Sequence, residues 1–448
     1  MAALAAEIAT RFQVHLDPIW CSWFDHPSPE SLLCGAFQTA VSVEALFADQ
    51  PSAIWPGLML PDTLPVIGNE YGDWICARVC SNDHFVELLH WYHGGGDWIP
   101  VGRSLVEAVM HDVADSLRPS GLQMLRGASE TIQLSDHQDF ASPLTRVLSD
   151  PWYANSLDCL ASAAGNPWNP QSVLSSFLES LQKSSYHTAL DILERAGLCT
   201  EAVACDQIER LLQTPLTAIA SHEVAAAIGS DWSPDFVRAL FDLSVVDEER
   251  RADICHHAGL TQDQWPFQDW ESAEQYALKI IARRSDLAWA YDIAGWAAQR
   301  DGRFDAAMKV YWRGRHASPF TDQSVRIRSH WYPERFCKFS ISQIVALSDQ
   351  LNSGLFRDPY LDLFQTPSFD AQDVAEYWLH LGELAMRENR YAEAYDLFYR
   401  AGWDLGVRQL AGYFPILTRL AEAAEAAGFR ARAAVALTHL ACLEDRIR

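Results

Sequence analysis

The chain has 448 residues and a formal net charge of −25. This length exceeds what one compact core usually holds, so we expect two or three domains. Hydrophobic residues make up 49% and 17 Trp are present, which is typical of a folded protein and excludes a largely disordered one. The acidic balance argues against a general nucleic-acid-binding protein, because phosphate contacts need Lys and Arg.

The negative charge is concentrated near the N-terminus. The first 117 residues contain 15 Asp or Glu, and their only basic residues are Arg11, Arg78 and Arg103. The first Lys of the sequence is Lys183. Such a field favours basic partners and speeds their encounter with the protein. The alternative is that the charge serves solubility alone.

Cysteine usage and hydropathy indicate where the protein resides. The ten Cys are scattered without a Cys-x-x-Cys pair, which fits free thiols in a reducing cytosol. Cys255-His256-His257 is the most suggestive group, but neighbouring side chains point in different directions, so we expect no metal or cofactor. The N-terminus lacks a basic leader, and no stretch approaches the roughly 18 apolar residues that cross a bilayer. We expect a cytoplasmic protein without membrane contact.

The first elements are short. Ala2–Phe12 is predicted to be a helix, and a loop rich in Pro and aromatic residues follows it. Val43–Phe47 could be a short strand or a helical turn. Thr63–Ile67 is a strand candidate that tolerates Pro65 only near its end or on an edge.

A β-hairpin is predicted from Asp73–Val79 and Phe85–Trp91, which turn-type residues separate. In the first strand the apolar residues alternate. In the second strand, Val86 and Leu88 should share the core face, and Phe85, Glu87, Leu89 and Trp91 should take the opposite face. That opposite face is half apolar, so we expect it to be covered by the helical domain or by a partner.

A helix should follow the hairpin and pack on its core face. Ser104-Leu-Val-Glu107 is a capping box, and apolar residues recur at helical spacing from there to Leu117. Gly94-Gly95-Gly96 is a loop. It is no phosphate cradle, because neither Lys-Ser/Thr nor a helix follows it directly.

This order of elements resembles the SUKH superfamily, also called the Smi/Knr family. The resemblance is carried by the run from Leu64 to Val79, by His90-Trp91-Tyr92-His93 and by the helix Ser104–Leu117. It implies a mixed α/β domain that binds proteins and turns over no substrate. Bacterial members include immunity proteins that neutralise a toxin, often a nuclease, and fungal members regulate cell-wall synthesis. A nuclease carries a basic surface for its own substrate, which an acidic protein can occupy.

The rest of the chain is predicted to be helical after a polar linker. Two windows, starting at Ala288 and Ala375, match the spacing of large and small residues in a tetratricopeptide helix pair. An insertion from about Phe320 to Asp370 separates them, so we expect a degenerate, interrupted right-handed solenoid. The other predicted helices are Gln171–Lys183, Ser185–Ala196, Glu201–Leu212, Asp235–Leu243, Ser272–Arg283 and Ile341–Leu351.

The insertion carries a dense basic stretch. Its members are Arg326, Arg328, His330, Arg335 and Lys338. This stretch could meet an acidic ligand or the acidic N-terminal domain of the same chain. The alternative is a solvated helix surface.

No catalytic constellation is evident: the sequence lacks a nucleophile elbow, a His-Glu-x-x-His, a P-loop and a dinucleotide fingerprint. His90 and His93, with Asp97 nearby, form the best group of titratable residues. A metal site needs a third or fourth ligand at matched spacing, so the alternative of two loop-edge histidines is favoured. We therefore expect no enzyme activity.

The sequence thus predicts a multidomain α+β protein. Residues 1–118 form a SUKH-like α/β domain, 119–150 a linker and 151–448 a helical tetratricopeptide-like domain. The expected function is non-catalytic protein binding, as a toxin-immunity protein with a basic partner, or alternatively as a regulatory scaffold whose helical groove binds peptides. The expected partner-binding residues are Asp73, Trp74, Asp83, Glu87, Trp91, Asp97 and Trp98.

Overall fold

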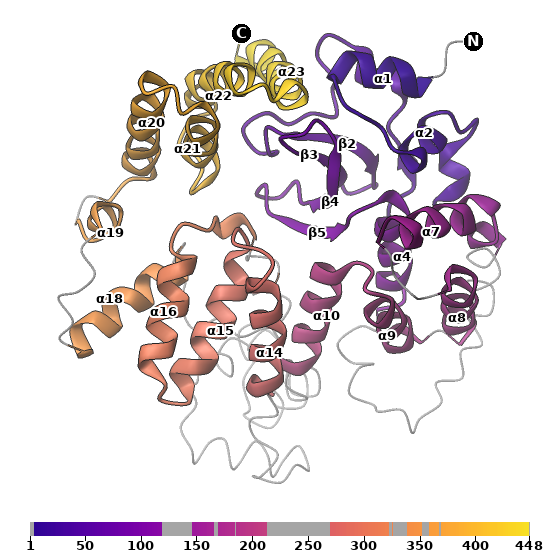
Figure 1. The fold of residues 1–448 in the computed structure, drawn as a ribbon, viewed down its shortest axis with the longest axis horizontal. Helices are drawn as coiled ribbons and strands as arrows, with labels where there is room; N and C mark the ends of the chain where they lie inside the picture. The colour runs from indigo at the N-terminus through magenta and orange to yellow at the C-terminus, as the bar shows by residue number, and fades with distance from the viewer. Residues whose placement is uncertain are drawn as a thin grey trace, which may run out of the picture.

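The computed structural model describes residues 4–118, 146–164, 169–183, 185–212, 269–321, 325, 338–351, 358–366 and 369–447. An antiparallel sheet near the N-terminus is surrounded by helices (Figure 1), which confirms a mixed α and β class. Most of the predicted linker, the predicted helix Asp235–Leu243, Cys255–His257 and the basic stretch from Arg326 to Arg335 lie outside the described residues.

The N-terminal segment forms α1 (Leu4–Phe12), α2 (Pro18–Phe24), the 3-10 turn η1 (Pro29–Leu32) and α3 (Val43–Phe47). The sequence left Val43–Phe47 as strand or helix. It is a helix because the Ser42 side chain accepts a hydrogen bond from the Ala45 backbone N–H at 3.1 Å, which caps its first turn.

The sheet is a simple meander of five antiparallel strands in sequence order. The strands are β1 (Thr39–Ala40), β2 (Thr63–Gly68), β3 (Trp74–Val79), β4 (Phe85–Trp91) and β5 (Trp98–Gly102). The hairpin β3–β4 confirms the sequence prediction, whereas β5 was not predicted. Pro65 lies beyond the reach of β1, which pairs only with Ile67 and Gly68, so the proline occupies an edge-like position as expected.

The first face of the sheet, which carries Ile75, Ala77 and Val79, packs against the N-terminal helices. The prediction that Val86 lies on this face is wrong: Val86 is 42% exposed and Phe85 is buried. The cause is a register shift, because Arg78 pairs with Glu87 while Val79 pairs with Phe85. Val86 is the extra residue of a bulge and points to solvent.

The capping-box helix is confirmed as α4 (Leu105–Asp115). The Ser104 hydroxyl accepts the Glu107 backbone N–H at 3.4 Å, and Glu107 Oε2 accepts the Arg103 backbone N–H at 2.7 Å. Val106, Val109 and their helical neighbours belong to the core of the first face, as predicted.

Helices follow from residue 151. Predicted helices within the described ranges are found with ends close to those expected, and α7, α19 and α22 are additional. The helices are α7 (Pro151–Ala164), α8 (Pro170–Gln182), α9 (Tyr186–Ala196), α10 (Thr200–Leu212), α14 (Trp270–Ile281), α15 (Ala288–Arg300), α16 (Phe304–Gly314), α18 (Phe339–Leu351), α19 (Pro359–Phe364), α20 (Ala371–Arg387), α21 (Tyr391–Trp403), α22 (Tyr413–Ala427) and α23 (Arg430–Ile447). They run around the sheet until α23 returns to α1 (Figure 1). We call α10 to α23 the helical array.

The two tetratricopeptide-like windows form the helix pairs α15–α16 and α20–α21. Their glycines permit the close approach that the sequence predicted. A Cβ added at Gly295 would lie 2.2 Å from the Tyr311 ring, and one at Gly382 would lie 2.4 Å from the Phe398 ring. An aromatic ring of one helix thus fills the space over a glycine of the other.

The apolar core does not divide at the expected domain boundary. The core of the first sheet face continues into α7, α8 and α9 through residues such as Trp152 and Phe177. The second sheet face, with Cys76, Leu89 and Trp91, shares a core with the helical array. The helical array therefore covers the half-apolar second face, which was one of the two alternatives.

Candidate functional site

The carboxylate of Glu87 lies on the second sheet face and is engaged within the chain. It accepts hydrogen bonds from Arg78 Nη1 at 2.9 Å and from Arg284 Nη1 at 2.7 Å. Arg284 follows α14, so this ion pair joins the sheet to the helical array. The Arg78 Nη2 atom also donates to the Tyr399 hydroxyl of α21 at 3.1 Å. Charged groups as well as apolar residues therefore hold the two parts together.

Asp83 is likewise used inside the chain. Its Oδ1 accepts the Ala431 backbone N–H at 2.9 Å, at the start of α23, and its Oδ2 accepts Arg430 Nε at 3.3 Å. A carboxylate at this position accepts a hydrogen bond from a backbone N–H group that has no partner within the helix. Its negative charge also interacts favourably with the positive end of the helix dipole. Asp83 therefore fastens the β3–β4 turn to α23.

The aromatic members of the expected binding face are covered. Trp91 and Trp98 are 2% and 3% exposed, and Asp97 is also buried. Trp91 Nε1 donates to the Leu58 carbonyl oxygen at 3.1 Å. Trp74 is half-buried and lies over Gly68.

The expectation of an exposed binding surface is therefore wrong for five of these positions, because the chain's own helices occupy the face. Those positions are Asp83, Glu87, Trp91, Asp97 and Trp98.

The expected histidine group gathers around Asp73. His93 Nδ1 lies 2.8 Å from Asp73 Oδ1, and His90 Nε2 lies 3.8 Å from Asp73 Oδ2. Asn69 Oδ1 accepts the Asp73 backbone N–H at 2.9 Å, which closes the β2–β3 turn. Burial alone would raise the pKa of Asp73, but hydrogen bonds from His90, His93 and Asn69 outweigh it and lower the pKa.

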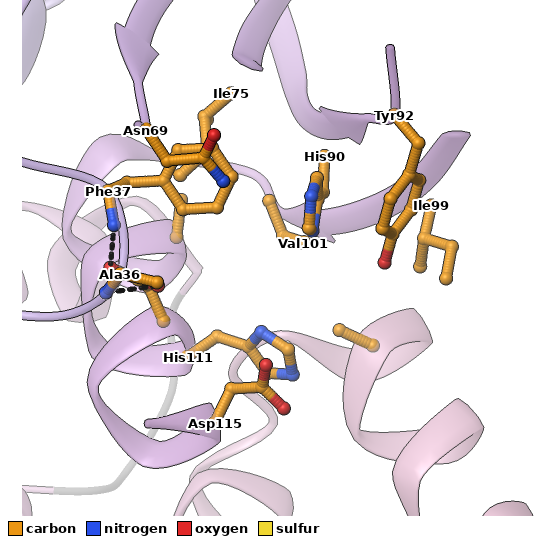
Figure 2. Close-up of a pocket in the computed structure, with 13 residues that line it drawn as sticks. Ala36, Phe37, Asn69, Ile75, His90, Tyr92, Ile99, Val101, His111 and Asp115 are labelled. Carbon is orange, nitrogen blue, oxygen red and sulfur yellow. Dashed lines mark hydrogen bonds between the residues drawn. The ribbon is translucent and has the colours of Figure 1, made fainter. Parts of the chain in front are cut away.

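A small pocket lies between this end of the sheet and α4. Figure 2 shows His90 and Tyr92 on the sheet side and His111 and Asp115 on the α4 side. His111 Nε2 is 2.8 Å from Asp206 Oδ2, so it links α4 to α10. The pocket measures about 80 Å³, which suits a few water molecules and no substrate of ordinary size.

Asp112 forms another wall of this pocket. It accepts the backbone N–H groups of Ala36 and Phe37 at 3.1 and 3.2 Å (dashed lines in Figure 2). Burial raises the pKa of Asp112 to about 7, against the effect of these two N–H groups. Its contacts hold the 35–37 loop on α4, and we assign the group a positioning role.

Most of the exposed carboxylates of residues 4–118 lie on or beside the N-terminal helices, and Glu70 in the β2–β3 turn is exposed as well. Asp17 and Asp25 act as caps, since they accept the backbone N–H groups of Ile19 and Ala5 at 2.8 and 3.0 Å. We define the outer acidic surface as Glu7, Asp17, Asp25, Glu30, Glu44 and Asp49, all of them exposed. The α1 helix packs against both α2 and α3, which carry or border Asp17, Asp25, Glu44 and Asp49, whereas Glu30 lies in η1.

No family model, curated protein or solved structure matches this chain. Membership of the SUKH superfamily and a tetratricopeptide solenoid therefore stay predictions. In the part of the chain that the structure describes, no group of three or more His, Cys, Asp or Glu is arranged to hold a metal ion. Within the same part, no helix combines the length and apolar character that a membrane span needs.

Sequence reasoning missed the arginines that pair with the carboxylate on the second sheet face. Arg284 lies in the short connection between α14 and α15, and nothing in its neighbourhood marks it as the partner of Glu87. The available signal was indirect: a half-apolar strand face that carries a carboxylate needs a cover with both apolar and basic groups.

Proposed function

We propose that this chain is a non-catalytic protein-binding protein whose outer acidic surface docks on a basic partner protein. The observation that carries the proposal is the exposure of every member of that surface. Arg11 is the only Lys or Arg among residues 4–60. These carboxylates are left over after other acidic residues of the domain have paired with arginines of the same chain.

A surface of one charge sign favours encounter with the opposite sign and makes binding depend on salt. A toxin-immunity role is the most specific form of the proposal, since a nuclease toxin is basic where it meets its substrate. The resemblance to SUKH proteins supports the same role. The proposed attachment surface differs from the one first expected: its residues lie on and between α1, α2, η1 and α3.

The alternative is a scaffold in which helical repeats bind a peptide along their groove. One observation weighs against it. Tyr399 and Trp403 of α21 bond to the sheet side of the chain, where Trp403 Nε1 donates to the Met59 carbonyl oxygen at 3.0 Å. A peptide along this side of the array would compete with the chain's own N-terminal domain.

Affinity purification from the source organism tests the proposal. The full chain should retain a basic protein, and a variant with Glu7→Lys, Glu30→Lys, Glu44→Lys and Asp49→Lys should lose at least about tenfold in affinity at low salt. Asp17 and Asp25 are left unchanged because they cap helices.

A control variant reverses the same number of charges elsewhere. It carries Asp305→Lys, Asp373→Lys, Glu376→Lys and Glu425→Lys, all at exposed positions of the helical array. This variant should bind almost as well as the original. Recovery of only acidic or neutral partners, or equal losses in both variants, would refute the proposal.

A further inference from the structure

A cavity of about 290 Å³ lies between the second sheet face and the helical array. We call it the central cavity. Arg78 and Trp98 line it from the sheet, and Arg313, Arg400 and Arg432 line it from α16, α21 and α23. Arg313 is exposed, so the cavity reaches solvent beside it. The size lies near the lower end of the range for small-molecule sites.

Most carboxylates of the central cavity are already neutralised by other groups. Asp62 accepts Arg78 Nε at 3.0 Å, and Asp286 accepts Arg284 Nη2 at 2.8 Å. Asp404 is paired with the buried Lys338 ammonium. Asp404 also accepts hydrogen bonds from the Tyr360 hydroxyl and, at 2.8 Å, from Trp378 Nε1. The exposed Asp396 is the carboxylate of this lining for which no such pair exists among the described residues.

Three arginines of the central cavity are held by aromatic rings. Arg313, Arg400 and Arg432 stack on Tyr291, Trp378 and Tyr395, with centroid distances of 5.9, 5.0 and 4.8 Å. Within the described part of the chain, none of the three forms an ion pair with a carboxylate. Stacking uses the face of a guanidinium and leaves its in-plane N–H donors available. Arg432 spends one of them on the Val79 carbonyl oxygen at 3.2 Å.

Two further observations concern the polar groups of the lining. Burial lowers the pKa of His316, and Arg315 and Arg400 lower it further, to about 3, despite the nearby Asp358. In addition, Trp98 Nε1 and the Tyr395 hydroxyl find no hydrogen-bond partner among the described residues, although these side chains are 3% and 1% exposed. Both are donors that a buried acceptor could satisfy.

We propose that the central cavity binds a compact small-molecule anion with two or more negative charges, held by Arg313, Arg400 and Arg432. Planar guanidinium groups suit phosphate and carboxylate oxygens, because they can donate two parallel N–H bonds to them. In a chain with a net charge of −25, three arginines that form no close ion pair within the described residues gather around this cavity, although the Asp396 carboxylate offsets part of the charge of Arg400 and Arg432. This inference is independent of the proposed outer acidic surface.

Calorimetric titration of the full chain with inorganic phosphate, ADP and citrate tests the proposal. At least one of the three should bind. Binding of phosphate or ADP would indicate a phosphate ligand, whereas binding of citrate would indicate a carboxylate ligand. In Arg400→Gln and Arg432→Gln, affinity should fall by about tenfold or more. Arg408→Gln removes the same charge at an exposed position of the array and should leave affinity unchanged.

Arg400→Lys keeps the charge and serves if Arg400→Gln does not fold. It should bind more weakly than the original chain, because an ammonium cannot reproduce the planar pair of donors. Circular dichroism confirms folding of each variant before titration. Failure of all three anions to bind, or equal losses in Arg400→Gln and Arg408→Gln, would overturn the proposal.

Discussion

Arg284 Nη1 lies 2.7 Å from Glu87 Oε2, and this hydrogen bond joins two residues that are 197 positions apart in the sequence. Both side chains are largely shielded, at 18% and 12% exposure. Arg78 Nη1 contributes a second bond to the same carboxylate at 2.9 Å. Glu87 thus sits between a cation of its own sheet and one of the helical array.

A double-mutant cycle on Glu87→Ala and Arg284→Ala should reveal strong coupling. Each single change leaves a charge with fewer partners in a poorly solvated place, so we expect a loss of about 2–4 kcal/mol in the free energy of unfolding. The coupling should exceed about 1 kcal/mol, measured by urea denaturation. The exposed pair Arg390 and Glu393 is the control, and its coupling should be much weaker because solvent screens both charges. Equal coupling for both pairs would contradict this assignment.

The buried His439 of α23 should make the protein sensitive to acid. Its Nε2 lies 2.9 Å from the Thr63 carbonyl oxygen, and burial lowers its pKa to about 4. Between about pH 6.5 and 4 the unfolded chain binds a proton that the native state does not, so stability falls as the pH falls. Across this window the loss from His439 alone is about 3 kcal/mol.

Substitution His439→Gln should flatten this dependence. Denaturant unfolding at several pH values between 6.5 and 4 measures the slope. His380 is exposed, and His380→Gln should leave the slope as it is. A slope that persists unchanged in His439→Gln would show that the acid sensitivity arises elsewhere.

Gly382 should not tolerate a methyl group. A Cβ there would lie 2.4 Å from the Phe398 ring, which is fully buried and cannot move freely. We expect Gly382→Ala to destabilise the protein by about 1–3 kcal/mol, despite the better helix propensity of Ala. Gly94→Ala has open space around it and should change the melting temperature little.

Because of the bulge in β4, we expect substitutions at the neighbouring residues Phe85 and Val86 to affect stability very differently. Phe85 is 8% exposed and its ring lies 4.6 Å from that of Trp20, so Phe85→Ala should cost about 3–5 kcal/mol. Val86→Lys should change stability by less than about 0.5 kcal/mol, because Val86 points to solvent. Thermal unfolding of both variants checks this register. An unbroken alternation of buried and exposed residues would instead make Val86→Lys the more destabilising change.

Local features of the fold were well predicted from the sequence. The capping box at Ser104, the β3–β4 hairpin and the Gly–aromatic spacing of α15–α16 and α20–α21 depend on residues close together in the chain. The bulge at Val86 was missed because a two-residue alternation does not reveal where an extra residue enters. Strand β5 was missed because Pro100 lies in its middle and is unusual there.

The candidate sites were predicted less well, for a physical reason. Charge density identifies acidic residues but not which of them face solvent. Asp83 and Glu87 find cations at Arg430 and Arg284, and only the folded chain brings these together. Asp73 meets His90 and His93 because the strands pair in register, whereas sequence proximity suggested Asp97.

The return of α23 to the sheet has a consequence for biosynthesis. Thr63 of β2 receives its contact from His439, which leaves the ribosome 376 residues later. Ala431, Val435 and Cys442 of the same helix complete the first apolar core. The N-terminal domain therefore emerges with an uncovered flank and acquires its final neighbours only near the end of translation. The longer the synthesis of the remaining chain takes, the longer this flank is exposed to association with other chains.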